Sequence, residues 1–515
     1  MLQAILLAAA ALLTSFLFRK LRYIRYKQYQ DIPQLPTSLL WGHLKIMGEF
    51  MSNGIPDRHL DKIFEEMWIA IGRPPVMFVD LRPLTPPMLL VSTHEVAEQV
   101  SKPSKRFPLS PTKSPTLTFM APIIGMTSII GKEHLWTLLP LILEKTIPFT
   151  RYLDQFADSG EVFSMEKLTS NLTFDIIGAA IMDYDLHTQE IDRSKQGELT
   201  RMFGELLRLY SDDKNNLPWW LNPRLAYKRR QLGRRIDNLV RNIIRQQFAE
   251  AKAQPRISSS TFTKDAKTIL TLSFQETDTL TPEALTETSD QVRTFFFGGH
   301  DSLNSLLQWI FYELSRTPRA LKAVRNELDS ILGPETGPAI ICARLLQHGN
   351  DVFPKMRYIK AMIKESLRLH PPASTVRLTA PGSGFTLHTP ADGKDYSVDG
   401  LMMYSCQFII QRDPAVFGDT ADVWVPERWL GEAGKGIPAT SWRPYERGPR
   451  NCIGQELANL ESRVIIAIIA RKYDFVKVGL GETVVDEKGR PELDNNGQFV
   501  VAKPLYNVSA QYYFF

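Results

Sequence analysis

Residues 441–461, SWRPYERGPRNCIGQELANLE, place Cys452 in a loop directly before a helical pattern. Leu457, Leu460 and Val464 recur at steps of three and four residues, and this spacing predicts a helix that begins just after the cysteine. The N-terminal end of a helix carries partial positive charge and free backbone N–H groups, and both stabilise a thiolate over a thiol. An isolated cysteine is most often a small buried hydrophobic residue, but this position favours a functional thiolate.

Two glycines and an arginine stand at fixed distances from this cysteine. Gly448 and Gly454 allow unusual turn geometries and a close approach of backbone to a flat ligand, and Arg450 is placed to meet an anion beside that ligand. A thiolate with an anionic, planar partner describes haem iron, whose propionates need a cation. The run Tyr-x-x-Gly-x-Arg-x-Cys-x-Gly, which starts at Tyr445, resembles the haem-binding signature of the cytochrome P450 family. That family usually has Phe at the first position.

A second motif, FFFGGHDS at residues 295–302, lies inside a predicted helix. The sequence Thr-Pro-Glu at 281–283 is typical of a helix start, and the pattern predicts a helix that ends near Arg316. Close helix packing through the two glycines, with a merely solvated aspartate, is one interpretation. The run also resembles the family's oxygen-activation helix, in which a kink leaves room for dioxygen. That resemblance implies that Asp301 and Ser302 relay protons, with Ser302 where the family usually has Thr.

A third motif is a charged pair on another predicted helix. Glu365 and Arg368 are three residues apart, so they share a helix face and can pair. Glu-x-x-Arg alone is uninformative, but here it precedes the cysteine loop with Pro-Glu-Arg-Trp at 426–429 between them. The family resemblance implies a buried network of Glu365, Arg368 and Arg428 behind the haem, and Arg377 as a second propionate contact. Buried charges must be fully paired, so such a network constrains geometry strictly.

The N-terminus predicts a membrane anchor. Residues 2–18 are almost wholly apolar and uncharged, and the basic residues Arg19, Lys20, Arg22, Arg25 and Lys27 follow. A spanning helix needs about 20 residues, with a lower limit near 17. Positive charge after the apolar stretch predicts a single pass with the body in the cytosol. A buried helix and a cleaved signal peptide are the alternatives.

Prolines divide the predicted anchor from the rest of the chain. Pro33 and Pro36 are expected to end the helix and separate it from the body. We therefore expect an anchor with a basic flank over residues 1–30 and a cytochrome P450 haem-thiolate catalytic domain over 31–515.

Composition narrows the class of protein. The 515 residues include only three cysteines, so no disulfide framework is expected and a reducing compartment suits the chain. Residues 1–30 hold five basic residues and no acidic one, so 61 − 5 = 56 basic residues face 56 acidic ones in the remainder. The body is thus neutral overall, and the sequence gives no argument for nucleic-acid binding.

Three further stretches carry expectations. Residues 74–92 predict two short strands around a proline-rich turn, and residues 256–280 predict a loop. Trp219 and Trp220 precede a basic run at 228–235, which suits a membrane interface; a core tryptophan pair beside a solvated basic face is the alternative. The resemblance implies that this region is a lid over the substrate entrance.

One stretch departs from the family. Cytochromes P450 carry a helix with Trp-x-x-x-Arg whose Trp and Arg hold a propionate. Here Trp136 is followed by Pro140, and no Arg appears until Arg151. We infer that about 15 residues are absent between His134 and Leu135, a length estimated from the turns such a helix needs.

The resemblance implies a mainly α cytochrome P450 fold with a minor β region, preceded by one transmembrane helix. It implies a monooxygenase in the endoplasmic reticulum membrane that binds haem b, O₂ and an apolar small molecule, with electrons from NADPH through a separate cytochrome P450 reductase. Residues 368–388 resemble fungal members that oxidise polyketides and related secondary metabolites. The alternatives are a reductase-independent rearrangement enzyme of the same family and a haem protein impaired by loss of the propionate helix. The expected pocket residues are Phe295, Phe296, Phe297, Thr375, Val376 and Leu505.

Overall fold

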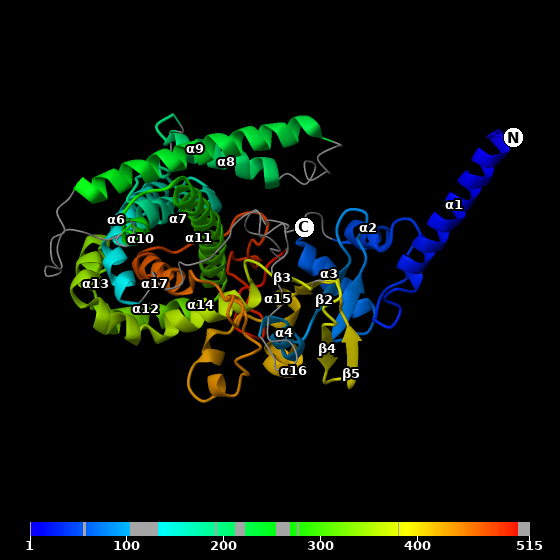
Figure 1. Ribbon diagram of the computed structural model, residues 1–515. Coiled ribbons are helices and arrows are strands. Elements are labelled where there is room, and N and C mark those ends of the chain that lie inside the picture. The colour runs from blue at the N-terminus through cyan, green and yellow to red at the C-terminus, as the bar shows by residue number, and fades with distance from the viewer. Residues whose placement is uncertain are drawn as a thin grey trace.

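Figure 1 shows the computed structural model of the chain, in which helices form one side and a small β-sheet lies toward the other. The structure describes residues 2–54, 58–102, 132–190, 192, 194–211, 222–253, 268–274, 278–379 and 381–502. Helix predominates over strand, so the predicted fold class, mainly α with a minor β region, is confirmed.

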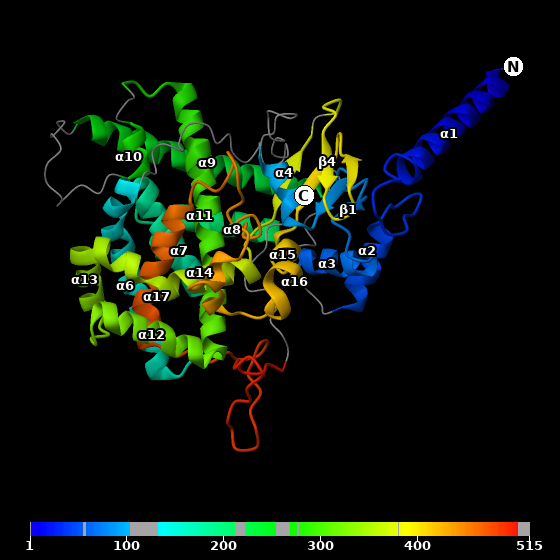
Figure 2. The same ribbon diagram turned by 90° about the horizontal axis from the view of Figure 1, so that it is seen from below.

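The long helix α11 (Pro282–Arg316) runs through the helical side (Figure 2). Its start follows the prediction, because the Thr281 hydroxyl accepts a hydrogen bond from the backbone N–H of Ala284 at 3.2 Å and Pro282 occupies the first turn. Five helices pack against it: α7 (Met165–Met182), α9 (Pro223–Ala253), α12 (Pro318–Leu332), α14 (Arg357–Leu369) and α17 (Gln455–Lys472).

The remaining described helices surround this bundle or the sheet. They are α1 (Leu2–Tyr26), α2 (Leu44–Asn53), α3 (Leu60–Ala70), α4 (His94–Ser101), α6 (Lys132–Ser159), α8 (Glu198–Ser211), α10 (Ile269–Ser273), α13 (Pro338–Val352), α15 (Gln407–Ile410) and α16 (Pro414–Phe417). Short 3-10 helices cover Phe353–Lys355, Gly418–Thr420, Pro426–Trp429 and Ala433–Lys435.

The main sheet has four strands in the order β1 (Val76–Val79), β2 (Met88–Val91), β6 (Met402–Ser405) and β3 (Thr375–Leu378). Strands β1 and β2 are antiparallel, which confirms the two strands predicted at 74–92. The β2–β6 pair is parallel and the β6–β3 pair is antiparallel. Strands β4 (Thr386–Thr389) and β5 (Lys394–Ser397) form a separate hairpin.

Both faces of the sheet are buried. Side chains alternate along a strand, so Val76 and Phe78 of β1 pack in one apolar cluster while Met77 and Val79 pack in another. The larger apolar core belongs to the helices around α11.

The segment after α1 differs from expectation. The helix ends at Tyr26, before the prolines, and the chain that follows packs on the sheet: Ile32 and Leu35 are buried, and the backbone N–H of Phe78 donates to the Pro33 carbonyl at 2.8 Å. Pro33 and Pro36 therefore do not separate helix from body, because tertiary packing fixes the intervening residues.

Two other expectations are modified. Helix α10 lies within the stretch expected to be a loop, and the Thr268 hydroxyl caps it by accepting from the Thr271 N–H at 3.2 Å. Helix α6 runs continuously across positions 134 and 135, with Pro140 and Pro148 inside it. Residues 103–131, which directly precede α6, and both Trp219 and Trp220 lie outside the described residues.

Candidate functional site

The Cys452 loop has the predicted place at the start of a helix. Gly454 is the N-terminal flanking residue of α17, and Cys452 stands two residues before it. The Cys452 backbone N–H donates to the Tyr445 carbonyl at 2.8 Å, and the Asn451 N–H donates to the Gly448 carbonyl at 3.2 Å. The cysteine forms no disulfide and is exposed. Its sulfur is therefore accessible beside the positive end of a helix.

The structure constrains the two glycines of the loop differently. Gly448 has φ +81°, and a Cβ there would lie 2.3 Å from the Ser101 carbonyl oxygen at the end of α4. A Cβ on Gly454 would lie 3.8 Å from the Cys452 sulfur, an ordinary contact. Gly448 is thus required by the turn and by the approach of α4, a reason that the signature itself does not reveal.

Two guanidinium groups near this loop make no ion pair with a carboxylate among the described residues. Arg377 lies buried in β3, where its Nη1 donates to the Val376 carbonyl at 2.9 Å. Burial lowers the pKa of Arg377; the Glu446 carboxylate opposes this shift and the charge of Arg450 adds to it. Among the described residues, neither Arg377 nor Arg450 makes an ion pair. Two cations without an ion pair, near an accessible cysteine, fit haem, which carries two propionates.

A third arginine of the loop is already paired. Arg443 is fully buried; its Nη1 lies 2.7 Å from Glu98, and its Nη2 pairs with Glu446. The Glu98 carboxylate is buried in part, and hydrogen bonds from Lys102 and Arg443 lower its pKa to about 2. Arg443 therefore joins the cysteine loop to α4 and is not available to a propionate.

The propionate helix of the family, which we expect to be missing from this chain, has no counterpart in the described residues. Trp136 packs on Phe353 with ring centroids 5.3 Å apart, in the contact between α6 and α13. Arg151 is exposed on α6. Neither side chain lies in the cysteine loop's surroundings described above.

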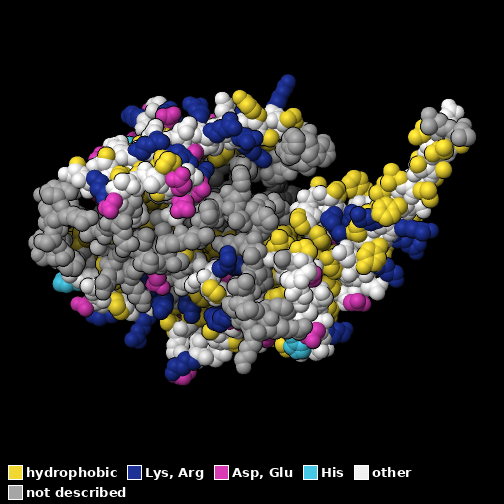
Figure 3. Space-filling model, viewed as in Figure 1, with side chains coloured by type: hydrophobic (Ala, Val, Ile, Leu, Met, Phe, Trp, Pro, Cys, Tyr) yellow, Lys and Arg dark blue, Asp and Glu magenta, His cyan; other side chains and the backbone are white. Residues whose placement is uncertain are grey.

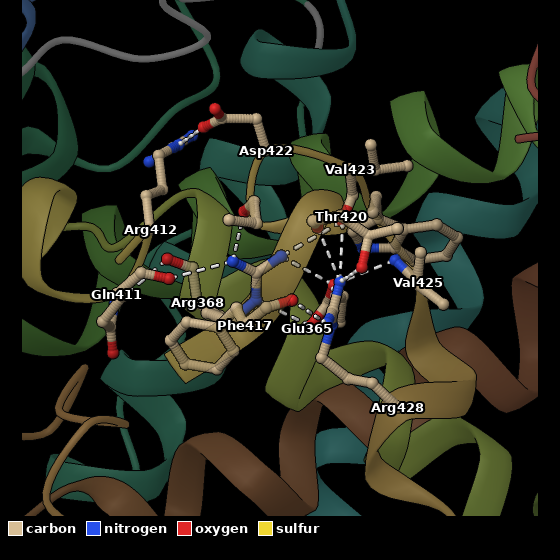
Figure 4. A network of polar contacts seen from close by, with 12 residues as sticks. Glu365, Arg368, Gln411, Arg412, Phe417, Thr420, Asp422, Val423, Val425 and Arg428 are labelled. Atoms are coloured by element: carbon tan, nitrogen blue, oxygen red, sulfur yellow. Dashed lines mark hydrogen bonds and ion pairs between the residues drawn. The ribbon is translucent and has the colours of Figure 1, made fainter. Parts of the chain in front are cut away.

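The three residues predicted to form a buried network are brought together (Figure 4). Glu365 Oε1 accepts from Arg368 Nη2 at 2.8 Å and from Arg428 Nε at 2.9 Å, while Oε2 accepts from Arg368 Nε at 2.9 Å. The Trp429 indole and the Val425 backbone N–H donate to the same carboxylate at 2.8 Å and 2.9 Å. Arg368 also donates to three backbone carbonyls, those of Gln411, Ala421 and Val423. Both charges of the central pair are fully buried and fully satisfied.

Gln411 connects this network to the cysteine loop, and sequence reasoning missed it. Its side-chain N–H₂ donates to the carbonyls of Leu367 and Arg368 at 3.0 Å and 3.1 Å, and its Oε1 accepts from the Arg443 backbone N–H at 2.7 Å. All of its polar atoms are used within a fully buried site. Gln411 is more than 30 residues from Arg368 and from Arg443 in the sequence, so no local motif indicated its role.

The oxygen-helix motif adopts unbroken helix through Gly298 and Gly299, without the kink expected from the family. A Cβ on Gly299 would lie 2.5 Å from Ile177 Cδ1, so this glycine serves close packing of α11 on α7. Ser302 is exposed, and its hydroxyl donates to the Gly298 carbonyl at 2.6 Å. The structure therefore supports close helix packing as the reason for Gly299. The face of α11 that carries Ser302 is exposed.

Asp301 faces the α7 side of α11. Burial raises its pKa to about 7, the nearby Glu166 carboxylate adds to the shift, and a hydrogen bond with Asn304 opposes it. Asn304 is oriented by two bonds to its Oδ1, from Thr169 Oγ1 at 2.5 Å and Gln308 Nε2 at 2.9 Å. Within the described residues no hydrogen bond joins Asp301 to Ser302. Asn304 and Gln308 were not anticipated, although both follow Asp301 at helical spacing.

The expected pocket residues divide into several groups. Phe296 is fully buried between Phe174 and Phe203, at centroid distances of 5.4 Å and 5.6 Å. Val376 lies in the apolar cluster of α3 and α15, because strand alternation turns it to the face opposite Arg377.

Thr375 lies on the Arg377 face of β3, and its hydroxyl accepts from Gln407 Nε2 at 3.3 Å. Phe295 is partly buried against the helical core. The Phe297 side chain and Leu505 lie outside the described residues.

A family model described as Cytochrome P450 matches residues 94–508 of the chain. The chain belongs to the cytochrome P450 family. This match confirms the family expected from the Cys452 signature. Members of the family bind haem through a cysteine thiolate and use O₂, a substrate and a redox partner.

Relatives of this P450 are fungal monooxygenases. Cytochrome P450 monooxygenase acrF from Aspergillus aculeatus is 29% identical over 439 residues, which cover 77% of this chain and 83% of that protein. Cytochrome P450 monooxygenase polC from Polytolypa hystricis is 24% identical over 503 residues, 91% of this chain and 86% of that protein. The bifunctional cytochrome P450/NADPH–P450 reductase ascE from Acremonium egyptiacum is 31% identical over 242 residues, 46% of this chain and 21% of that protein. These names support an oxidoreductase.

Proposed function

We propose that this P450 is a haem-thiolate monooxygenase whose iron ligand is Cys452. The observation that carries the proposal is an accessible cysteine at the N-terminus of α17, near the guanidinium groups of Arg377 and Arg450, which make no ion pair among the described residues. When bound, haem b supplies an iron centre at which dioxygen is split and one oxygen atom passes to the substrate, the other being reduced to water.

The protein's own residues have distinct tasks in this proposal. The end of α17 stabilises the Cys452 thiolate, and the Tyr445 carbonyl holds its backbone. Arg377 and Arg450 hold the propionates. The Glu365 network, joined to the loop through Gln411, fixes the distance between α14 and the cysteine. Among the described residues, Phe295, Phe296, Thr375 and Val376 are our candidates for the substrate pocket.

Asp301 and Ser302 deliver protons from α11. Asp301 holds a proton near neutral pH, and Ser302 presents a hydroxyl on the open side of the helix. Since no bond joins the two side chains, the transfer needs rotation of Asp301 or a bridging water molecule. Asn304 fixes the resting orientation of Asp301.

We further propose an apolar small molecule of fungal secondary metabolism, of polyketide type, as the substrate. The resemblance of residues 368–388 to fungal polyketide-oxidising members supports this class, and the relatives acrF and polC are fungal monooxygenases. Electrons come from NADPH through a separate NADPH–cytochrome P450 reductase; a fused reductase occurs in the relative ascE. Residues 1–30 anchor the chain in the endoplasmic reticulum membrane with residues 31–515 on the cytosolic side. The apolar helix Gln3–Tyr26 supports a membrane span by length and composition.

The test of this function is reconstitution of the full chain in membranes with the reductase, followed by profiling of products lost on gene deletion. We expect a product one oxygen atom heavier than its precursor, formed only with NADPH and O₂. Product formation without reductase would instead establish the rearrangement enzyme. A chain that neither retains haem nor forms product would establish the impaired haem protein.

Replacing Asp301 with asparagine is expected to lower product formation per NADPH consumed and to raise hydrogen peroxide release. Proton delivery is damaged while haem and substrate binding are kept, because Asp301 lies on the α7 side of α11. The measurement is the ratio of product to NADPH, with peroxide assayed in parallel. Asp290→Asn is a matched control on the same helix, since Asp290 pairs with Arg293 there. Equal coupling in wild type and Asp301→Asn would rule out the role.

The coupling of NADPH consumption to product should depend on pH in the wild type and not in Asp301→Asn. Because burial and Glu166 raise the pKa of Asp301 to about 7, the proton is bound below that pH and lost as pH rises through it. Coupling in the wild type should therefore fall between about pH 6 and 8. His300, buried beside Asp301, does not titrate there because burial lowers its pKa to about 4. If the coupling ratio of Asp301→Asn does not change with pH, the fall in the wild type is due to the Asp301 carboxyl.

Haem retention is expected to be poor in the chain as written. A hydrogen bond to a charged group contributes roughly 1.5–3 kcal/mol, so losing one or two propionate contacts weakens binding by about one to several orders of magnitude. We expect low haem per chain after purification, and recovery in a chain with about 15 residues inserted near position 134, including Arg four places after Trp.

The native transcript should encode such a segment, and sequencing the transcript tests this directly. Arg151→Ala is the control for a substitute contact, because Arg151 is exposed on α6 and should not affect haem content. Full haem occupancy of the chain as written would overturn the prediction.

A further inference from the structure

A buried ion-pair triad joins the C-terminal end of α1 to the sheet. Arg25 Nη1 lies 2.6 Å from Asp80 Oδ2, with both side chains almost fully buried. Arg82 binds the same carboxylate through two bonds, Nε to Oδ1 at 2.8 Å and Nη2 to Oδ2 at 2.7 Å. Such a desolvated triad holds its geometry strictly, because breaking one pair leaves a buried charge without a partner.

Backbone contacts tighten the same junction. Arg25 Nη2 also donates to the carbonyls of Leu40 and Arg82, at 2.8 Å and 2.9 Å, and Arg82 Nη2 donates back to the Ile24 carbonyl at 3.2 Å. The end of α1 is thus bonded to two separate loops of the body. Figures 1 and 2 both show α1 projecting from this point, with α2 beside its base.

The junction leaves no room for a side chain at Gly42. It has φ +57°, and a Cβ there would lie 2.4 Å from the Asp80 carbonyl oxygen and 2.5 Å from Arg25 Nη1. Only glycine satisfies both the turn and the close approach. We call Arg25, Gly42, Asp80 and Arg82 the junction lock.

Exposed apolar side chains adjoin the junction lock along the chain. Leu40 and Trp41 directly precede Gly42, and Leu84 follows Arg82 by two residues; they are 65%, 57% and 59% exposed. We call these three residues the junction patch. Figure 3 shows yellow apolar side chains gathered where α1 meets the body, with Lys and Arg beside them. Tyr23 and Tyr26 of α1 are also exposed, and aromatic side chains favour the headgroup region of a membrane.

The length of α1 places this patch at the membrane surface. The uncharged stretch ends at Phe18, and Arg25 follows seven residues later, which is about 10 Å along a helix. The headgroup layer on one side of a bilayer is roughly 5–8 Å thick. The body therefore begins where the headgroups end, with no spacer between them.

We propose that α1 and the catalytic body form one rigid unit, held by the junction lock, which keeps the junction patch seated on the lipid headgroups. The occupant of the patch is a bilayer surface, because the patch is continuous with the anchor and the exposed basic residues Arg19, Lys20, Arg22 and Lys27 beside it attract anionic lipids. This inference rests on the proposed membrane span of α1. The junction lock would fix the orientation of the P450 body relative to the membrane, whereas a flexible linker would let the body rotate.

The test is photolabelling of the full chain in vesicles of phosphatidylcholine and phosphatidylserine that contain a headgroup-proximal diazirine lipid. Adducts are then mapped to peptides by mass spectrometry. In the wild type we expect adducts on α1 and on the peptides that contain Leu40, Trp41 and Leu84. In Arg25→Gln and Gly42→Ala, patch adducts should fall at least about fivefold, since an unlocked body samples many orientations. Adducts on α1 should persist in both variants.

Arg490→Gln is the matched control, since it breaks a surface ion pair with Asp486, outside α1 and the patch, and leaves the lock intact. It should keep the patch adducts. Unchanged patch adducts in both Arg25→Gln and Gly42→Ala would overturn the lock. A wild type labelled on α1 alone would overturn the seating of the patch. A wild type without α1 adducts would overturn the membrane span itself, a separate failure.

Discussion

Replacing Glu365 with glutamine is expected to cost the protein roughly 3–5 kcal/mol of folding free energy, the usual effect of breaking a buried, hydrogen-bonded ion pair. Glu365 accepts five hydrogen bonds: three from the side chains of Arg368 and Arg428 and two from Trp429 and the Val425 backbone. Glutamine offers one acceptor oxygen in place of two. Its amide N–H₂ would meet other donors, and two buried guanidinium groups would lose their counter-charge.

This loss is a large share of a typical stability of about 5–15 kcal/mol. We therefore expect little soluble protein, and lower haem content in what remains, because the network also bonds Gln411, which holds the Arg443 backbone of the cysteine loop. The measurement is urea unfolding of the purified protein, or its yield when too little is obtained.

Glu432→Gln is a matched control for the same chemical change. Glu432 pairs with Lys435 at the surface, where both side chains are mostly exposed, and such pairs contribute at most about 1 kcal/mol. If Glu365→Gln and Glu432→Gln have similar free energies of unfolding, the Glu365 network does not stabilise the fold as we propose.

Local patterns predicted the elements that local physics governs. The start of α11 followed from Thr281 and Pro282, and its end at Arg316 followed from the proline after it. The pairing of Glu365 with Arg368 followed from their three-residue spacing on a helix. Cys452 was placed at a helix start because apolar side chains recur directly after it.

Contacts between distant segments could not be predicted in this way. Arg25 looked like one of several basic residues after an apolar stretch, yet it is buried against Asp80 of a distant strand end. The packing of Phe296 between Phe174 and Phe203 could not be predicted either, because those rings come from other helices. Gln411 carries no motif, and its role arises only when α14 and the cysteine loop come together.

The second large effect concerns the iron ligand. Cys452→Ser should remove thiolate ligation, because a serine hydroxyl remains protonated at neutral pH and does not replace a thiolate sulfur as the iron ligand. The other two cysteines are unsuited to this role. Burial raises the pKa of Cys342 to about 11, and burial together with Asp61 raises that of Cys406 far above its usual range. Both remain neutral thiols.

The most direct measurement is therefore the absorption spectrum of the ferrous–CO complex in full chains that carry Cys452→Ser, Cys406→Ser or Cys342→Ser. We predict that the red-shifted Soret band of a thiolate-ligated haem disappears in Cys452→Ser alone and persists in the other two. Persistence of the band in Cys452→Ser, with its loss in Cys406→Ser or Cys342→Ser, would contradict the assignment of Cys452 as the ligand.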